Sequence, residues 1–275
     1  MDYKRILTVQ DISCVGQCSL TVALPVISAC GVETAVLPSA VLSTHTAGFT
    51  GWTFRDLTED MPAIARHWAK EDVRFDAIYT GYLGSCKQIE YVSALFSEFG
   101  KNAVKVVDPA MADNGKLYVG FDMAFVEQMK GLCAKADYLV PNLTEACFLT
   151  GEEYKESYDE QYIRNIVGKL QALGCKNIVL TGVSYEQGKT GVLVQQGAKS
   201  DYYCHTKLPN SCHGTGDIYA SAFVGALMRG KEAYDAARIA ADFVLECITE
   251  SAKDPSHTYG ARFEPVLYKL NEMLK

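Results

Sequence analysis

The segment Asn210-Ser-Cys-His-Gly-Thr-Gly-Asp217 combines the residue types that bind and transfer a phosphoryl group. The start of a helix offers unpaired backbone N–H groups and the positive end of the helix dipole, and glycines let an anion approach them closely. Gly214, Thr215 and Gly216 therefore predict a phosphate site. Asp217 adds a carboxylate beside it, able to accept the proton of an alcohol in phosphoryl transfer. The alternative is an ordinary helix N-terminus with an acid in its first turn.

Polar, glycine and turn residues also follow each buried strand that the sequence predicts. In an open parallel sheet, ligands bind outside the carboxyl ends of the strands, so these positions predict one shared catalytic cleft. The positions are Gln10-Asp11, Thr80-Gly81-Tyr82, Asp108-Pro109, Pro141-Asn142 and Thr181-Gly182.

Asp108, Asn142 and Glu145 offer hard oxygen ligands that suit a Mg²⁺ ion carrying a nucleotide. Asp108 ends one expected strand, and Asn142-Leu-Thr-Glu145 opens the helix after the next. Each residue also has a plainer interpretation. Asn142 can cap the helix with Glu145 in its first turn, and Asp108 can be a turn acid before proline. Together with Asp217 at another strand-end loop, the three favour the metal–nucleotide interpretation.

The segment Gly182-Val-Ser-Tyr-Glu-Gln-Gly-Lys-Thr190 is similar to a P-loop but has the wrong spacing. Five residues, rather than four, separate its first glycine from the Gly-Lys pair, and residues 191–195 alternate as a strand rather than opening a helix. A phosphotransferase with this sequence must belong to another class.

The loop Ser39–Trp52 mixes hydroxyl groups, His45 and two aromatic side chains. Aromatic faces for stacking and hydroxyls for edge hydrogen bonds suit a flat polar ring better than a bare sugar. The alternative is a surface loop with incidental aromatic residues. We assign no chemistry to the other histidines, although His213 can shape the anion loop.

The elements that must position these groups alternate between strand and helix patterns. This alternation predicts a three-layer α/β fold with a mostly parallel central sheet and helices on both faces. No repeat or linker divides residues 1–275, so we expect one domain. Expected strands are 5–10, 33–38, 77–80, 104–107, 138–140 and 177–180, followed by a hairpin of 191–195 and 202–204. Expected helices are 19–30, 58–70, 87–99, 123–135, 159–173, 217–229, 232–250 and 265–274.

Composition narrows the classes of partner and compartment. A net charge of −7 without a Lys/Arg run argues against nucleic acid and anionic membranes as partners. The apolar runs are much shorter than the roughly 20 residues of a membrane span. The N-terminus leads directly into a strand pattern, so we expect no signal peptide. The ten cysteines include no Cys-x-x-Cys pair, which predicts free thiols in a reducing cytoplasm.

Five motifs together resemble the ribokinase-like superfamily and, within it, the vitamin B6 (pyridoxal) kinases. The resemblance covers nearly the whole chain. Three motifs are shared across the superfamily and occur in the same order: Asp108-Pro-Ala-Met, Pro141-Asn-Leu-Thr-Glu145 and Gly214-Thr-Gly-Asp217. Two point to the B6 kinases: Ser43-Thr-His-Thr46 is similar to their Ser-Asn-His-Thr element, and Gly81-Tyr-Leu-Gly-Ser85 to the loop after their third main strand.

The resemblance implies ATP-dependent phosphorylation of the 5′-hydroxymethyl group of pyridoxal, pyridoxamine or pyridoxine. It implies Asp217 as the catalytic base and Gly214–Gly216 as the anion hole for the γ-phosphoryl group. It implies that Thr46, His45 and Tyr82 line the pyridine pocket. It also implies a homodimer.

The resemblance assigns the nucleotide side as well. Asn142 and Glu145 are implied to hold Mg²⁺ through water. Asp108, a further metal-side residue, and Asp113 are implied to lie near the triphosphate and near a place for a monovalent cation such as K⁺. Thr181 is implied to contact the phosphates, and the segment after Gly182 to cover the adenine.

The chain departs from the B6 kinase pattern at the first strand end. The family's Gln-Ser-His-Val element has a serine that reads the pyridine ring, whereas Gln10-Asp-Ile-Ser13 has Asp11 at that position. A carboxylate there can pair with a protonated ring nitrogen or an amine, so we expect Asp11 to shift the preference among vitamers. Thr44 also stands where asparagine is more usual.

Other functions stay open at this point. A hydroxymethylpyrimidine kinase is the nearest, because Cys212 borders the Gly-Thr-Gly loop as in that family, although its Gly-Ser-Asp opening is missing. A sugar kinase lacks its Gly-Gly element here. A non-catalytic vitamin-binding protein would not need Asp217 and Glu145. A zinc or redox protein is the most distant alternative.

Overall fold

The computed structural model describes residues 3–209 and 212–275. Asn210 and Ser211, which begin the expected anion segment, lie outside the described residues. Nine strands form the main sheet, and two short ones form a separate hairpin. The main-sheet strands are β1 Arg5–Ser13, β2 Glu33–Leu42, β3 Phe54–Asp56, β4 Ala77–Thr80, β5 Val104–Val107, β8 Tyr138–Leu139, β9 Asn177–Val183, β10 Lys189–Gln196 and β11 Lys199–Thr206. The separate hairpin consists of β6 Ala112–Asp113 and β7 Lys116–Leu117.

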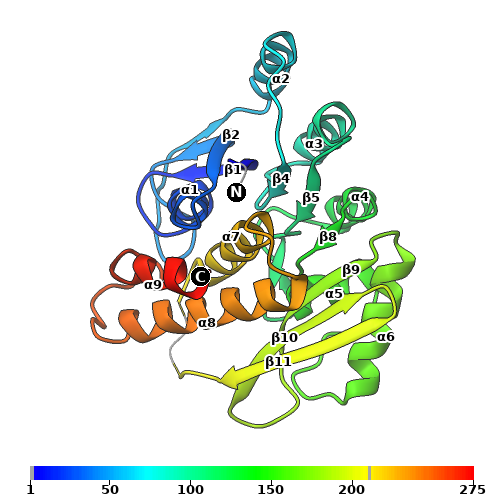
Figure 1. Cartoon of the computed structure of the whole chain (residues 1–275), viewed down its shortest axis with the longest axis vertical. Coiled ribbons are helices and arrows are strands. Elements are labelled where there is room, and N and C mark those ends of the chain that lie inside the picture. Colours follow the sequence, from blue (N-terminus) through cyan, green and yellow to red (C-terminus); the bar gives the residue numbers. More distant parts are fainter. Residues whose placement is uncertain (1–2, 210–211) are drawn as a thin grey trace.

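The strand order of the main sheet is β11-β10-β9-β8-β5-β4-β1-β2-β3 (Figure 1). The strands from β9 to β2 in this order pair in parallel, whereas β3, β10 and β11 pair antiparallel at the two edges. Short apolar strands buried on both faces are typical of a parallel sheet. The carboxyl ends of the central strands therefore meet at one edge of the sheet, as the sequence predicts.

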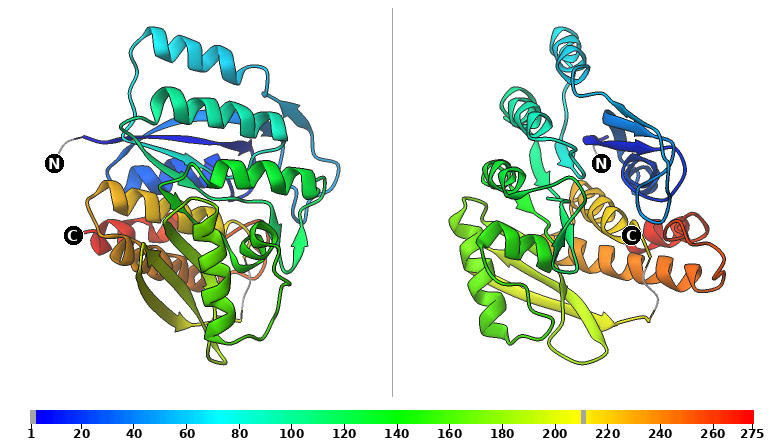
Figure 2. Two further views of the ribbon diagram at one scale, coloured as in Figure 1. Left: turned by 90° about the vertical axis from the view of Figure 1, so that its right-hand side faces the viewer. Right: turned by 180° about the vertical axis from the view of Figure 1, so that it is seen from behind.

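Helices cover both faces of the sheet and create two apolar cores (Figure 1 and Figure 2). One face carries α2 Met61–Lys70, α3 Cys86–Phe99, α4 Met123–Cys133, α5 Leu143–Thr150 and α6 Glu160–Ala172. The other carries α1 Leu20–Ala29, α7 Thr215–Met228, α8 Ala233–Ser251, the 3₁₀ turn η1 Glu264–Val266 and α9 Leu267–Met273. The predicted three-layer α/β fold is confirmed.

The structure also corrects the sequence-based element assignment. The first four residues of the expected front loop, Ser39 to Leu42, belong to β2, which extends beyond its predicted end at Pro38. Strand β3 and the β6–β7 hairpin were not predicted. All three residues of β3 are exposed, so they carry none of the apolar alternation that identifies a half-buried strand.

Helix α7 packs so closely on α1 that one of its glycines has no room for a side chain. A Cβ placed on Gly225 would lie 2.4 Å from the Sγ atom of the buried Cys30. We therefore expect Gly225→Ala to lower the free energy of unfolding by about 1–3 kcal/mol in urea denaturation, because overpacking forces a shift. Gly168→Ala in α6 is the matched control, since nothing lies within 4 Å of its Cβ. It should raise stability by up to about 1 kcal/mol, and equal effects of the two would contradict the prediction.

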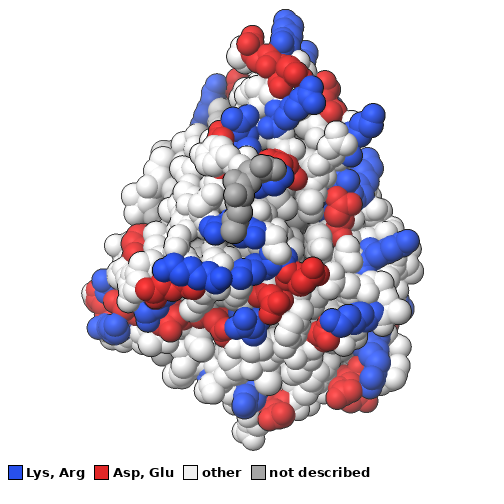
Figure 3. All heavy atoms as spheres, viewed as in Figure 1, with Lys and Arg blue, Asp and Glu red and all other residues white. Residues whose placement is uncertain are grey.

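Lys/Arg and Asp/Glu side chains are intermixed on the face shown in Figure 3. Among the described residues, no helix is both long and apolar enough to cross a membrane. All ten cysteines are free. Among the described residues, no three or more His, Cys, Asp or Glu side chains form a cluster that could hold a metal ion by themselves, without a ligand that brings the ion in.

Candidate functional site

A cavity of about 510 Å³ lies where β5, β8 and β9 end and α7 begins. Its lining contains every residue that we predicted for catalysis, ATP binding or metal binding. These residues are Asp108, Asp113, Asn142, Glu145, Thr181, Gly182, Gly214, Thr215, Gly216 and Asp217. Strand ends far apart in the sequence thus meet at one site, as expected for an open parallel sheet.

The anion loop has the backbone conformation that its glycines permit. Gly214 is the N-cap of α7 and has a φ of +77°, in the left-handed region that favours glycine. A Cβ at this position would lie 1.8 Å from the carbonyl oxygen of Gln17. At Gly216, nothing lies within 4 Å of the Cβ position, so the cavity is open there for a ligand. The first turn of α7 therefore presents its free N–H groups to the cavity.

Asp217 is a carboxylate suited to accept a proton near neutral pH. Burial raises the pKa of Asp217 to about 7, and the negative charge of Asp11 adds to the rise. A hydrogen bond from the backbone N–H of Ser19 opposes this rise. A general base works best when its pKa lies close to the operating pH.

Asn142 and Glu145 form the capping box that the sequence left as the plainer alternative. The side chain of Asn142 accepts a hydrogen bond from the Glu145 N–H at 2.9 Å, and Glu145 Oε2 accepts one from the Asn142 N–H at 2.8 Å. Glu145 Oε1 also accepts from the Met111 N–H at 3.1 Å, and Asn142 Nδ2 donates to the Ala112 carbonyl at 2.9 Å. Because these groups are already engaged, contact with an ion through bridging water suits them better than direct ligation.

When ionised, the carboxyl groups of the cavity wall bring negative charge without a compensating Lys or Arg among the described lining residues. Asp108, Asp113, Glu145 and Asp217 line it, and its lining residues within the described chain include no Lys or Arg. Burial raises the pKa of Asp108 and of Glu145 well above their ordinary values, and neighbouring carboxylates add to both shifts. A triphosphate could bind here only with cations that offset this charge. The donor set therefore fits Mg²⁺ brought in with a nucleotide.

The four residues predicted for the pyridine side are outside this cavity's lining. Asp11 is buried and accepts a hydrogen bond from the Ser13 hydroxyl at 3.2 Å. Burial raises the pKa of Asp11, while hydrogen bonds from Ser19 and Ser13 oppose the rise. Tyr82 stacks on Phe121, with ring centroids 5.4 Å apart. Burial raises the pKa of Tyr82 and of Asp217, and the charge of Asp11 adds to both shifts.

His45 cannot read a substrate through its ring nitrogens, because the backbone occupies both. The Ala47 N–H donates to Nδ1 at 3.2 Å, so the proton is on Nε2, which donates to the Tyr259 carbonyl at 3.0 Å. His45 is buried, and its ring packs on Phe49 and His213. Its neighbour Thr46 is exposed. His45 therefore holds loops together and offers a substrate only its ring surface.

Sequence reasoning missed several residues at the site. Tyr118, which follows the β6–β7 hairpin, lines the cavity, and so does His205. A signal for this hairpin was present: Asn114 and Gly115 have φ values of +50° and +75°, and Asn-Gly is the strongest short hairpin signal.

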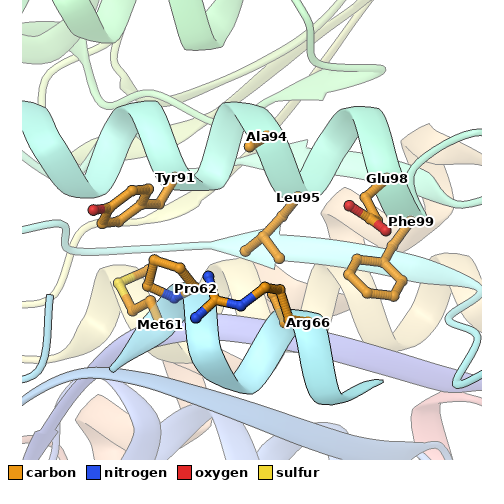
Figure 4. Close-up of a pocket in the computed structure, with 9 residues that line it drawn as sticks. Met61, Pro62, Arg66, Tyr91, Ala94, Leu95, Glu98 and Phe99 are labelled. Atoms are coloured by element: carbon orange, nitrogen blue, oxygen red, sulfur yellow. The ribbon is translucent and has the colours of Figure 1, made fainter. Parts of the chain in front are cut away.

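A second, smaller pocket of about 150 Å³ lies between α2 and α3 (Figure 4). Met61, Pro62 and Arg66 face Tyr91, Leu95 and Glu98 across it. It contains none of the residues predicted for chemistry, so we assign the function to the larger cavity.

Comparison with known proteins shows the same fold and identifies the family to which the chain belongs. The model of the phosphomethylpyrimidine kinase family matches residues 23–261. A protein from Bacteroides thetaiotaomicron, assigned as a phosphomethylpyrimidine kinase and crystallised with pyridoxal, is 38% identical, with a TM-score of 0.91 over 98% of this chain and 96% of its own. The pyridoxal kinase from Lactobacillus plantarum is 31% identical, with a TM-score of 0.91 over 98% and 97%.

The hydroxymethylpyrimidine/phosphomethylpyrimidine kinase of Bacillus subtilis is 28% identical over 215 residues, which are 76% of each chain. The relatives thus divide between two closely related kinase activities on one fold. The chain therefore belongs to the phosphomethylpyrimidine kinase family, has the ribokinase-like fold of the pyridoxal kinases, and is a kinase of a B6 vitamer or of hydroxymethylpyrimidine.

Proposed function

We propose that this protein transfers the γ-phosphoryl group of ATP to the 5′-hydroxymethyl group of a B6 vitamer. The observation that supports this most strongly is the first turn of α7, which joins the phosphate loop Gly214–Gly216 to Asp217 with its pKa near 7. The negative charge of Asp11 adds to the raised pKa of Asp217. A carboxylate such as Asp11 can form a charge-assisted hydrogen bond with a protonated pyridine nitrogen or an amine. The pyridoxal in the crystals of the Bacteroides relative agrees with this substrate class.

In the proposed reaction, Asp217 accepts the proton of the hydroxymethyl group as its oxygen attacks the γ-phosphorus. The bond between that phosphorus and the β,γ-bridging oxygen breaks, and ADP leaves with the electron pair. The N–H groups of Gly214–Gly216 stabilise the equatorial oxygens of the transferring group. Asp108 and Glu145, with Asn142, would hold Mg²⁺, which when bound offsets the charge of the phosphates. The K⁺ site and the homodimer stay predictions.

We also propose that residues 1–275 act as one domain. The main sheet takes its strands from most of the chain, between Arg5 and Thr206, and α9 packs back on α1. A chain in which both ends support the same sheet offers no boundary at which to divide it.

Hydroxymethylpyrimidine kinase is the second candidate, favoured by the family model and the Bacillus relative. A coupled assay of ADP release with Mg-ATP separates the two. Pyridoxal, pyridoxamine, pyridoxine and hydroxymethylpyrimidine are compared at equal concentration. The proposal requires the highest kcat/KM for a B6 vitamer. Turnover of the pyrimidine alone would establish the second candidate, and turnover of none would refute both.

We expect Asp11→Ser to change the order of preference among the vitamers. Pyridoxamine carries an extra ammonium group that a buried carboxylate can pair with, so its kcat/KM should fall most, by about tenfold or more relative to pyridoxine. The three specificity constants, measured on both proteins, check this. Equal changes for all three vitamers would show that Asp11 does not discriminate among them.

A further inference from the structure

The segment Tyr259–Ala261, just before η1, is hydrogen-bonded to three different loops. The Tyr259 carbonyl accepts hydrogen bonds from the Gln17 N–H at 3.1 Å and from His45 Nε2 at 3.0 Å. The Ala261 N–H donates to the His213 carbonyl at 3.0 Å. These partners lie in the loop after β1, the loop after β2 and the loop before α7. One tripeptide thus connects the strand end that carries Asp11, the front loop and the anion loop.

Gly260, at the centre of this segment, is packed against Gln17 too tightly for any other residue. Its φ is +140°, and a Cβ would lie 2.6 Å from Gln17 Cβ and 2.9 Å from Gln17 N. Gln17 also lies against Gly214. A Cβ on Gly214 would be 1.8 Å from the carbonyl oxygen of Gln17. The backbone of Gln17 is therefore held between the glycine of the C-terminal segment and the first glycine of the anion loop.

Side chains strengthen the same connection. Gln17 Nε2 donates to Glu264 at 3.3 Å, and Gln17 Oε1 lies 3.0 Å from His257 Nε2. The Tyr259 ring packs on His257, with centroids 4.1 Å apart, and lies 6.4 Å from the ring of Phe49 in the front loop. None of these contacts involves the strand ends of β5, β8 or β9, where the nucleotide-side residues lie.

We propose that Tyr259–Ala261 is a positioning element for the alcohol substrate, with Gly260 as its key residue. It fixes the front loop and the loop after β1 relative to the anion loop, so that the hydroxyl group meets Asp217 and the γ-phosphoryl group in one geometry. Such placement matters because a shift of about 1 Å can reduce turnover by about 10²-fold. The inference rests on the proposed function.

The test is Gly260→Ala, with Gly197→Ala as the matched control. Gly197 also has a positive φ, of +57°, but nothing lies within 4 Å of its Cβ. We expect Gly260→Ala to lower kcat/KM for the preferred alcohol at least about tenfold. The Kd of ADP, measured by calorimetry, should change less than about twofold, because ADP needs only the strand-end side. The control should change neither quantity by more than about twofold.

A second variant, His45→Ala, keeps the inference testable if Gly260→Ala is poorly folded, and a double-mutant cycle combines the two variants if both fold. His45→Ala removes one of the three hydrogen bonds and should lower kcat/KM of the alcohol without changing ADP affinity. If both variants act through one connection, their combined effect will be smaller than the product of the separate ones. A folded Gly260→Ala enzyme with unchanged kcat/KM would overturn the inference. So would an equal loss of ADP affinity and alcohol turnover in His45→Ala.

The proposed function can fail separately. If the wild-type protein turns over no alcohol, the function is refuted, and the positioning element is then tested by the Kd of pyridoxal for the wild type and Gly260→Ala. A weaker Kd in the variant supports the element, and an equal Kd overturns it.

Discussion

Asp217→Asn should lower kcat by about 10²–10⁴-fold, the range by which a positioned general base accelerates proton transfer. Asparagine has the same shape but cannot accept the proton of the hydroxymethyl group. The Kd of ADP should stay within about twofold, because the substitution leaves the nucleotide-side residues at the ends of β5, β8 and β9 unchanged. Steady-state kinetics with the preferred vitamer and calorimetry with ADP measure the two quantities.

The neighbouring helix offers a matched control for this substitution. Asp235 is an exposed acid in the first turn of α8, as Asp217 is an acid in the first turn of α7. Asp235→Asn should leave kcat unchanged. A kcat for Asp217→Asn within tenfold of the wild type would mean that another group accepts the proton.

The raised pKa of Asp217 adds a dependence on pH. Because the base must be ionised, kcat/KM should fall as the pH decreases below about 7. The same shift affects stability in the opposite direction. The folded protein favours the protonated carboxyl, because its folded-state pKa exceeds the ordinary value of 3.8. The resulting stabilisation of the folded state is fully present below pH 3.8 and is lost as the pH rises through about 7. Asp217→Asn should therefore melt at a higher temperature than the wild type at pH 8.

Gly214→Ala should have the second-largest effect, lowering kcat/KM by about 10²-fold or more. The new methyl group would lie 1.8 Å from the Gln17 carbonyl oxygen, and the φ of +77° disfavours alanine, so the anion loop must move. Loss of one well-placed donor to a developing charge typically reduces turnover about 10²–10³-fold. The melting temperature should fall too, because the clash is with the backbone.

The other end of α7 provides the comparison. Gly230 follows α7 and has a φ of +81°, but nothing lies within 4 Å of its Cβ position. Gly230→Ala therefore has the backbone strain without the clash, and it should lower the melting temperature slightly and leave kcat/KM unchanged. If the two variants lost activity equally, the packing of Gly214 on Gln17 would not be the cause.

The position of the nucleotide side could be predicted from the sequence because several of its residues lie at or just after the carboxyl end of a strand. Asp108, Asn142 and Thr181 are fixed by the ends of β5, β8 and β9, and an apolar run next to a polar residue is visible in one sequence. The role of Glu145 was harder to predict from the sequence. A capping box and a metal site need the same residue types at the same spacing, and the structure shows the capping box.

The alcohol side could not be predicted in the same way, because long-range backbone contacts create it. The carbonyl of Tyr259 determines which nitrogen of His45 carries the proton, although 214 residues separate the two. Backbone groups are identical in every residue, so no side-chain pattern reveals such a contact. Within Tyr259–Ala261, Gly260 is the residue whose type could indicate such close packing, but a glycine can occur at a position for many other reasons.

Helix α7 and the β6–β7 hairpin both contribute to the cavity lining but differ in burial. Every residue from Ile218 to Ala226 is buried, so the amide hydrogens of this helix can exchange with solvent only when much of the protein unfolds. The β6–β7 hairpin is only two residues long on each side, and Asp113 and Lys116 are exposed, so we expect its amide hydrogens to exchange faster than those of α7. We therefore expect hydrogen exchange to divide the cavity lining, with the body of α7 as its slowest-exchanging element and the β6–β7 hairpin as a faster one.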